Sequence, residues 1–327
     1  MTVQDIRFYV EGVRSGNRRV LSKAITLIES SLPAHQDTSK EILDTLLPFT
    51  GKAVRLGVTG VPGVGKSTFV ESLGMMLTNM GKKVAVLAVD PSSTRSGGSL
   101  LADKTRMEKL AVQDGAFIRP SPSGGTLGGV ARKTRETMLI CEAAGFDVII
   151  VETVGVGQSE TTVASMVDFF LVLMLAGAGD QLQGIKKGVL EIADAIAINK
   201  ADGDNIQKAE QARNEYETAL HYLTPETLTW TPPVLTCSSL EHTGIDKIWE
   251  TVTSHRQALS ETQELMQKRR RQALEWMWFL VEEGLRDRFY KHPDVKEKLP
   301  QMVTDVKSGI MTPTIAAFSL LDLLENT

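Results

Sequence analysis

The chain has 327 residues, of which 42% are hydrophobic and 23% charged, and its formal net charge at pH 7 is −4. This length allows a sizeable buried core, and the composition is typical of a globular chain rather than a disordered one. Chains that bind nucleic acid or an anionic membrane usually have a surplus of basic residues, which is absent here. We therefore expect no nucleic acid and no membrane among the partners.

The cysteines and the apolar segments bear on the cellular compartment. Cys141 and Cys237 are the only two cysteines, and each lies in an apolar stretch. This favours buried free thiols over a disulfide or a zinc site. Asp5 and Glu11 occur where a signal peptide would have a cationic start and an apolar run. The longest apolar run, residues 169–178, is too short to cross a bilayer. We expect a cytoplasmic protein or, in a cell with organelles, one inside an organelle.

The first 50 residues are predicted to be helical, because Ile6, Val10 and Val13 recur at a spacing of three to four residues. From residue 54 onward, short apolar runs alternate with helical stretches. The expected strands are residues 54–59, 84–89, 116–119, 147–151, 169–175, 195–199 and 234–236. Such apolar strands separated by helices predict an α/β fold with a mostly parallel central sheet covered by helices on both faces. Residues 261–327 are predicted to be helical again.

A glycine-rich segment follows the first expected strand and matches the pattern G-x-x-x-x-G-K-S. It comprises Gly60, Val61, Pro62, Gly63, Val64, Gly65, Lys66, Ser67 and Thr68. The glycines let backbone N–H groups converge on phosphates, and the next helix adds its dipole and its unpaired donors. Lys66 would neutralise the β- and γ-phosphates, and Ser67 would bind Mg²⁺. We expect a P-loop NTPase domain over residues 51–260, between helical extensions at 1–50 and 261–327.

Two acidic residues are expected beside the phosphates. Asp90 and Glu152 come at the ends of predicted parallel strands, whose carboxyl ends meet at the ligand crevice. Both are candidates to hold Mg²⁺, Glu152 through water. Glu152 also opens an E-x-x-G motif whose Gly155 amide can contact a γ-phosphate. The next residue is Val156, where many GTPases have a water-orienting glutamine, so we expect slow intrinsic hydrolysis.

A second motif specifies the base. Asn199, Lys200 and Asp202 form N-K-x-D at the end of an expected strand. The aspartate would accept hydrogen bonds from guanine N1–H and from the 2-amino group, whereas adenine offers neither donor there. After the next strand, one further loop resembles the last guanine-contacting loop of GTPases, whose backbone N–H binds guanine O6. Its residues are Cys237, Ser238, Ser239 and Leu240. Together these motifs predict a GTP or GDP site.

Four longer segments carry a resemblance to a known family. They are residues 89–93 (VDPSS), 97–107 (GGSLLADKTRM), 152–160 (ETVGVGQSE) and 180–188 (DQLQGIKKG). In these the chain resembles the methylmalonyl-CoA mutase-associated GTPases of the MeaB/ArgK type, a family of P-loop GTPases. The similarity extends over nearly the whole chain. Ala102 is a departure, since the family usually has glycine at this position.

The resemblance implies a GTP-hydrolysing chaperone for an adenosylcobalamin-dependent acyl-CoA mutase, which gates cofactor loading and protects or reactivates the enzyme. It places Asp90 and Asp103 on a first switch, where both would bind Mg²⁺ and serve catalysis together with Lys66 and Glu152. Glu152 would belong to a second switch. Gln183 and Lys186 would belong to a third switch that signals to the mutase.

The C-terminal segment is expected to mediate assembly. Its first helix has an apolar stripe formed by Leu274, Met277, Trp278, Val281, Leu285 and Phe289. Aromatic side chains in such a stripe are enriched at interfaces. The resembling family forms homodimers through C-terminal helical arms, and we expect the same here.

Alternative functions are weighed on the same residues. A nickel metallochaperone GTPase should carry a His- or Cys-rich tract, whereas the five histidines here are scattered. A kinase that acts on an amino-acid transport system could use the same P-loop, but N-K-x-D favours guanine over adenine. The basic run of residues 268–271 is interpreted as a solvated helix face, because Glu275, Glu282 and Glu283 follow it.

Overall fold

A computed structural model of the chain describes residues 5–30, 32–89, 107–120, 127–153, 159–177, 187–220 and 229–324. The chain divides into two compact units, Met1–Met266 and Gln267–Thr327. None of the helices in the described ranges combines the length and the apolar character needed to cross a membrane.

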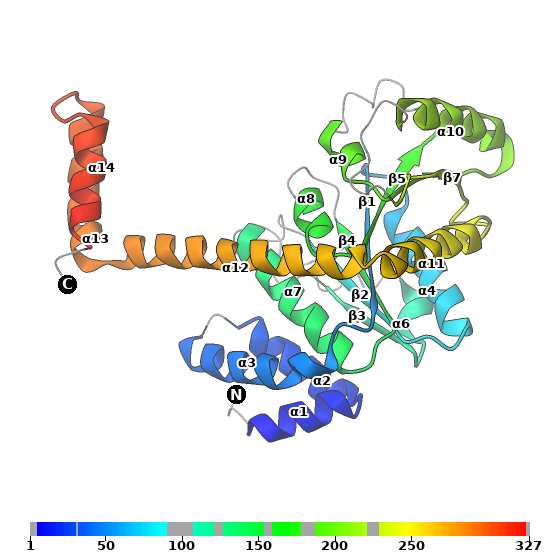
Figure 1. Cartoon of the computed structure of the whole chain (residues 1–327), viewed down its shortest axis with the longest axis horizontal. Coiled ribbons are helices and arrows are strands. Elements are labelled where there is room, and N and C mark those ends of the chain that lie inside the picture. Colours follow the sequence, from blue (N-terminus) through cyan, green and yellow to red (C-terminus); the bar gives the residue numbers. More distant parts are fainter. Residues whose placement is uncertain are drawn as a thin grey trace. The chain divides into compact units, whose positions relative to one another are not determined.

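The first unit begins with three helices, as the sequence predicts. They are α1 (Ile6–Arg14), α2 (Arg18–Ile28) and α3 (Pro33–Leu46), followed by the short η1 (Leu47–Phe49). Asn17 caps α2, since its side chain accepts from the backbone N–H of the second and third helical residues. All three helices contact α7 (Leu127–Ala143), beside which Figure 1 shows them grouped.

Seven strands form the central sheet. They are β1 (Val54–Gly60), β2 (Val84–Val89), β3 (Ala116–Arg119), β4 (Val148–Thr153), β5 (Phe169–Leu175), β6 (Ala195–Asn199) and β7 (Val234–Thr236). Their order is β3-β2-β4-β1-β5-β6-β7, and every pairing between them is parallel. The chain first adds strands on one side of β1 (β2, β3 and β4) and then crosses over β1 to add β5, β6 and β7 on the other side. The strand order therefore reverses at β1. Ligands of open α/β sheets bind beyond the carboxyl ends of the strands at such a point.

Helices cover both faces of this sheet, which confirms the predicted fold class (Figure 1). On one face, α4 (Lys66–Asn79), α6 (Glu108–Ala111) and α11 (Ile245–Glu261) share a core with buried strand residues such as Leu56 and Ile150. On the other face, a Cβ at Gly57 would meet side chains of Phe170 and of Val163 in α8 (Ser159–Ala164). Successive strand residues point to opposite faces, so Leu56 faces the layer of α4, α6 and α11, and Gly57 faces the layer of α8. The remaining helices α9 (Lys187–Glu191), η4 (Gly203–Asn205) and α10 (Ile206–Leu220) lie between β5 and β7 in sequence.

Two strands extend beyond the ends that the sequence suggested, β1 by one residue to Gly60 and β4 by two residues. The fourth was expected to end at residue 151, but β4 continues to Thr153. Glu152 pairs with Val58 of β1 and with Ala88 of β2, so two neighbouring strands stabilise this extension. The Glu152 carboxylate is therefore carried by a strand that is held on both sides.

The second unit consists of helices. It contains most of α12 (Glu264–Lys291), with α13 (Pro293–Lys307) and α14 (Pro313–Asp322). α13 and α14 contact each other. Pro293 and Pro313 each begin a helix, where a missing backbone N–H has no cost, and Thr312 accepts from the Ile315 N–H as the N-cap of α14.

Candidate functional site

The turn between β1 and α4 has the form of a phosphate cradle. Gly65 has a φ of +93°, and a Cβ at this position would come within 3.0 Å of Asn199 Nδ2. Glycine is needed here both for the left-handed backbone and for the close approach of Asn199. The cradle residues predicted from the sequence lie at the end of β1 (Gly60), in the turn (Val61, Pro62, Gly63, Val64 and Gly65) and at the start of α4 (Lys66, Ser67 and Thr68). A helix N-terminus at such a turn provides N–H donors for an anion.

Lys66 is held against the turn. Its Nζ donates hydrogen bonds to the carbonyl oxygens of Gly60 at 2.8 Å and of Val61 at 3.2 Å, and the side chain is buried. A buried ammonium is costly unless it is paired or hydrogen-bonded. These carbonyls keep the charge at the mouth of the turn, where a phosphate would meet it.

Ser67 and Glu152 provide oxygen ligands of the kind that Mg²⁺ prefers. Ser67 Oγ donates to Glu152 Oε1 at 2.9 Å, and Glu152 is buried. No cluster of three His, Cys, Asp or Glu side chains occurs in the ranges that the structure describes. This donor set still fits Mg²⁺, because that ion commonly binds one or two protein oxygens together with phosphates and several waters.

A buried pair of threonines orders the strand ends beside these ligands. Thr59 Oγ1 and Thr153 Oγ1 lie 2.7 Å apart, and both residues are fully buried. They link β1 to β4 one residue before Gly60 and one residue after Glu152. The sequence alone did not single out either threonine.

Asn199 connects the cradle to the predicted base loop. Its Nδ2 donates to Val64 O at 2.8 Å, and its Oδ1 accepts from Ser239 N at 3.1 Å and from Ser239 Oγ at 2.8 Å. The Cys237 thiol lies 3.6 Å from the same oxygen. Burial raises the pKa of Cys237 to about 12, so the thiol stays protonated and can donate. One buried amide thus fixes the distance between two loops.

Asp202 is the residue expected to contact the guanine. Its Oδ2 accepts a hydrogen bond from Ser238 Oγ, and Ala201 N donates to Cys237 O at 3.0 Å. Lys200 has a φ of +61°, and its carbonyl accepts from Asn205 Nδ2 at 2.7 Å. These contacts join the N-K-x-D segment to the loop after β7.

The family model for the methylmalonyl-CoA mutase-associated GTPase MeaB matches residues 21–294. The chain belongs to the MeaB family of GTPases. Membership implies that the chain binds guanine nucleotide.

Individual relatives are similar to this chain over nearly the whole of its length. The GTPase ArgK of Escherichia coli is 50% identical over 316 residues, which are 97% of this chain and 96% of that protein. The mitochondrial methylmalonic aciduria type A homolog of Mus musculus is 44% identical over 320 residues, 95% of this chain and 77% of that protein. A crystal structure of an LAO/AO transport system kinase superposes with a TM-score of 0.80 at 43% identity, covering 99% of this chain and 100% of that one.

Several residues predicted for the MeaB-type site lie outside the described ranges. They are Asp90, Asp103, Gly155, Gln183 and Lys186. Asp90 directly follows the last residue of β2, and residue 154 directly follows the last residue of β4. Of the predicted site, the structure brings together the cradle, Glu152, the N-K-x-D segment and residues 237–240, through the contacts of Ser67 and Asn199 described above.

Proposed function

We propose that the chain binds GTP with Mg²⁺ at the carboxyl edge of the sheet and hydrolyses it there. The observation that supports this most is the convergence of three groups on one edge: the Lys66 turn, the Ser67–Glu152 pair and the Asp202–Ser238 pair. In phosphoryl transfer the protein mainly positions the reactants and stabilises the charge on the phosphates. The lysine, the metal-binding oxygens and the base-binding carboxylate proposed here would serve these two purposes.

Each group has a distinct role in this proposal. Lys66 exchanges its bonds to the Gly60 and Val61 carbonyls for β- and γ-phosphate oxygens. Ser67 would hold Mg²⁺ through its hydroxyl oxygen, and Glu152, which now accepts from Ser67 Oγ at 2.9 Å, would hold it through water. Bound Mg²⁺ would neutralise charge that develops on the phosphates. Asp202 would accept from the guanine N1–H and from the 2-amino group, and Asp90, Asp103 and Gly155 would act beside the γ-phosphate.

The client of this GTPase is proposed to be an adenosylcobalamin-dependent acyl-CoA mutase of the methylmalonyl-CoA mutase type. The family description and the methylmalonic aciduria homologs support this partner. The chain would gate cofactor loading and protect or reactivate the mutase in the cytoplasm, with Gln183 and Lys186 transmitting the nucleotide state.

The test is a pull-down of the purified mutase with this chain in three states: nucleotide-free, with GDP, and with a non-hydrolysable GTP analogue, all with Mg²⁺. We expect the amount of captured mutase to differ between the GDP and the GTP-analogue states. Lys66→Ala, which should not bind the triphosphate tightly, serves as the control and should show no such difference. Equal capture in all states, or no capture, would contradict the chaperone proposal.

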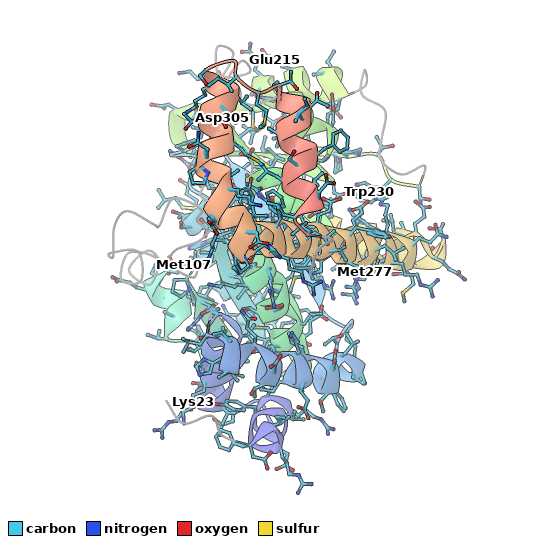
Figure 2. All side chains as sticks on the ribbon, turned by 90° about the vertical axis from the view of Figure 1, so that its left-hand side faces the viewer. Lys23, Met107, Glu215, Trp230, Met277 and Asp305 are labelled. Atoms are coloured by element: carbon cyan, nitrogen blue, oxygen red, sulfur yellow. The ribbon has the colours of Figure 1, made fainter. Side chains whose placement is uncertain are left out.

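The C-terminal segment, residues 261–327, is proposed to form a homodimer. Leu274, Met277, Trp278, Val281 and Leu285 of α12 are all exposed, and Met277 is labelled in Figure 2. Trp276 and Phe279 stack on the same helix with ring centroids 5.0 Å apart. An exposed apolar surface with aromatic side chains is typical of an interface. In a symmetric dimer the same face of each copy would cover the other.

A kinase that acts on an amino-acid transport system is the alternative, and the solved structure cited above is described as an LAO/AO transport system kinase. The two functions differ in nucleotide and in acceptor. A kinase would transfer the γ-phosphate of ATP to a protein, whereas adenine would offer the Asp202 carboxylate neither of the two donors that guanine provides. Incubation with γ-labelled ATP and GTP distinguishes them by the appearance of free phosphate or of labelled protein.

A further inference from the structure

The loop that follows β7 is a tightly closed turn. Ser238 N donates to Thr243 O at 3.0 Å, and Thr243 N donates to Ser238 O at 3.1 Å, so these two residues close it. Glu241 N donates to Ser238 Oγ at 3.1 Å inside the turn. Gly244 follows with a φ of +72°, and a Cβ there would lie 2.4 Å from Thr236 O. The backbone of residues 238–243, which we name the 238–243 turn, therefore has little freedom at its base.

His242, which directly precedes the closing residue Thr243, adopts an unusual backbone conformation. Its φ is +58°, a left-handed value that few non-glycine residues adopt, although His, Asn and Asp adopt it more often than others. Its side chain is fixed, because His242 Nδ1 and Ser72 Oγ lie 2.6 Å apart. Ser72 is buried in the second turn of α4, the helix that begins at Lys66. A strained residue thus connects the turn to the helix of the phosphate cradle.

The turn is held from two sides as a result. On the inner side, Asn199 Oδ1 accepts from Ser239 N and Ser239 Oγ. On the outer side, His242 contacts Ser72. Among the backbone amides of residues 237–241, only that of Leu240 donates no hydrogen bond within the described part of the chain. Leu240 is exposed, so the amide that remains available lies between the two attachment points.

We propose that His242 is a positioning residue for guanine recognition: through Ser72 it fixes the 238–243 turn so that the Leu240 N–H meets guanine O6. This inference rests on the proposed GTP site and names the side chains that set its selectivity at the 6-position. A donor that is already in place loses little entropy on binding and discriminates sharply between acceptors. If the 238–243 turn were released from α4, the Leu240 N–H would still be present, but the turn could move to accommodate a different atom at the 6-position of the base.

The experiment compares the affinities of the full chain for GTP, 6-thio-GTP and ITP by calorimetry. 6-Thio-GTP keeps both guanine donors for Asp202 but replaces O6 with a larger sulfur, which is a weaker acceptor. ITP keeps O6 but lacks the 2-amino group. The two affinity ratios therefore report separately on the 238–243 turn and on Asp202.

Three variants separate the side-chain contact from the backbone strain. His242→Gly removes the contact while favouring the left-handed backbone. Ser72→Ala removes the partner and leaves the turn sequence intact. His242→Asn keeps a polar atom the same number of bonds from Cα as Nδ1 and tolerates the backbone, so it should restore the contact. Ser22→Ala is the matched control, since Ser22 is a helical serine whose hydroxyl donates to Arg18 O of its own helix.

We expect the preference for GTP over 6-thio-GTP to fall about three- to tenfold in His242→Gly and in Ser72→Ala, the range for one net hydrogen bond. The double variant should fall no further than either single one. The GTP-to-ITP ratio should stay unchanged, and His242→Asn should recover most of the preference.

The contradicting results are equally distinct. An unchanged 6-thio-GTP ratio in both His242→Gly and Ser72→Ala would overturn the inference, and so would a wild-type chain that binds GTP without preferring it to 6-thio-GTP. A parallel fall in both ratios would show general loosening of the site and would also overturn it. A wild-type chain that binds none of the three nucleotides would instead refute the proposed GTP site.

Discussion

Ser67 Oγ lies 2.9 Å from Glu152 Oε1, and this hydrogen bond joins the first turn of α4 to the last residues of β4. The hydroxyl comes from the helix that begins the phosphate cradle, and the carboxylate comes from a strand whose end is fixed by the buried Thr59–Thr153 pair. The structure therefore holds two oxygen atoms of the kind that Mg²⁺ prefers next to each other at the proposed phosphate cradle.

Ser67→Ala should raise the Mg²⁺ requirement. The substitution removes the Ser67 hydroxyl from the proposed Mg²⁺ ligands and leaves Glu152 without the Ser67 donor, while α4 should still form because alanine is a good helix former. We expect the Mg²⁺ concentration for half-maximal GTP hydrolysis to rise by about tenfold or more. A phosphate-release assay over a range of Mg²⁺ concentrations measures it. Ser22→Ala is the control, and an identical Mg²⁺ dependence for Ser67→Ala and wild type would contradict the assignment.

Asp202→Asn should change the base preference from guanine to xanthine. An amide cannot accept from both guanine donors, but it can donate to the C2 carbonyl of xanthine. We expect GTP binding to weaken by roughly 2–4 kcal/mol, the effect of losing a charged hydrogen-bond partner, and XTP binding to strengthen. Calorimetric titration with both nucleotides provides the values. Asp204→Asn, an exposed neighbour in η4, should bind GTP as the wild type does. Unchanged GTP affinity in Asp202→Asn would show that the base is bound elsewhere.

Much of this site follows from local sequence patterns. The glycine-rich turn, the N-K-x-D segment and the strands before them are contiguous, so each motif predicts its own position at the carboxyl edge of a parallel sheet. The contacts that fix their spacing are not contiguous. Thr59 and Thr153 are 94 residues apart, and Ser72 and His242 are 170 residues apart. A threonine in a strand or a histidine in a loop has no distinguishing pattern, so only the fold shows these pairs.

Contacts between residues far apart in the sequence also explain why the end of β4 was predicted two residues too early. Glutamate is unfavourable in most strands, and a strand that ends at residue 151 was therefore the reasonable prediction. Pairing with Val58 on one side and with Ala88 on the other outweighs that preference. The long-range register decides the end of the strand, and with it the position of the carboxylate.

Trp278→Glu should dissociate the proposed dimer. Trp278 is exposed on α12 in the single chain, and a carboxylate at the centre of a symmetric contact would be buried without a partner. Light scattering at micromolar concentration should give twice the chain's 35.7 kDa for the wild type and the single-chain mass for the variant. Trp278→Phe keeps an aromatic ring and should remain dimeric. A wild-type mass of one chain would refute the dimer, whatever the variants show.

The thiol groups should be unreactive in the native protein. Both cysteines are buried, and burial raises the pKa of Cys237 to about 12, so almost no thiolate is present at pH 8. A thiol-titrating reagent should detect none in the native chain and two in urea, and fast reaction of one native thiol would contradict this structure.

The raised pKa of Cys237 also makes the stability of the fold depend on pH. An unfolded thiol has a pKa of about 8.5, so Cys237 loses its proton at a lower pH in the unfolded chain than in the folded one. Cys237 should therefore lower the free energy of unfolding as the pH rises from about 8.5 toward 12.

The most direct test of the proposed function is the rate of phosphate release from GTP by the wild-type chain, measured with and without the adenosylcobalamin-dependent mutase. Val156 occupies the place where many GTPases have a water-orienting glutamine, so the chain alone should turn over slowly. We expect the mutase to raise the rate several-fold, and Lys66→Ala to show no release under either condition. A fast rate for the chain alone that the mutase leaves unchanged would contradict the account of a partner-regulated GTPase.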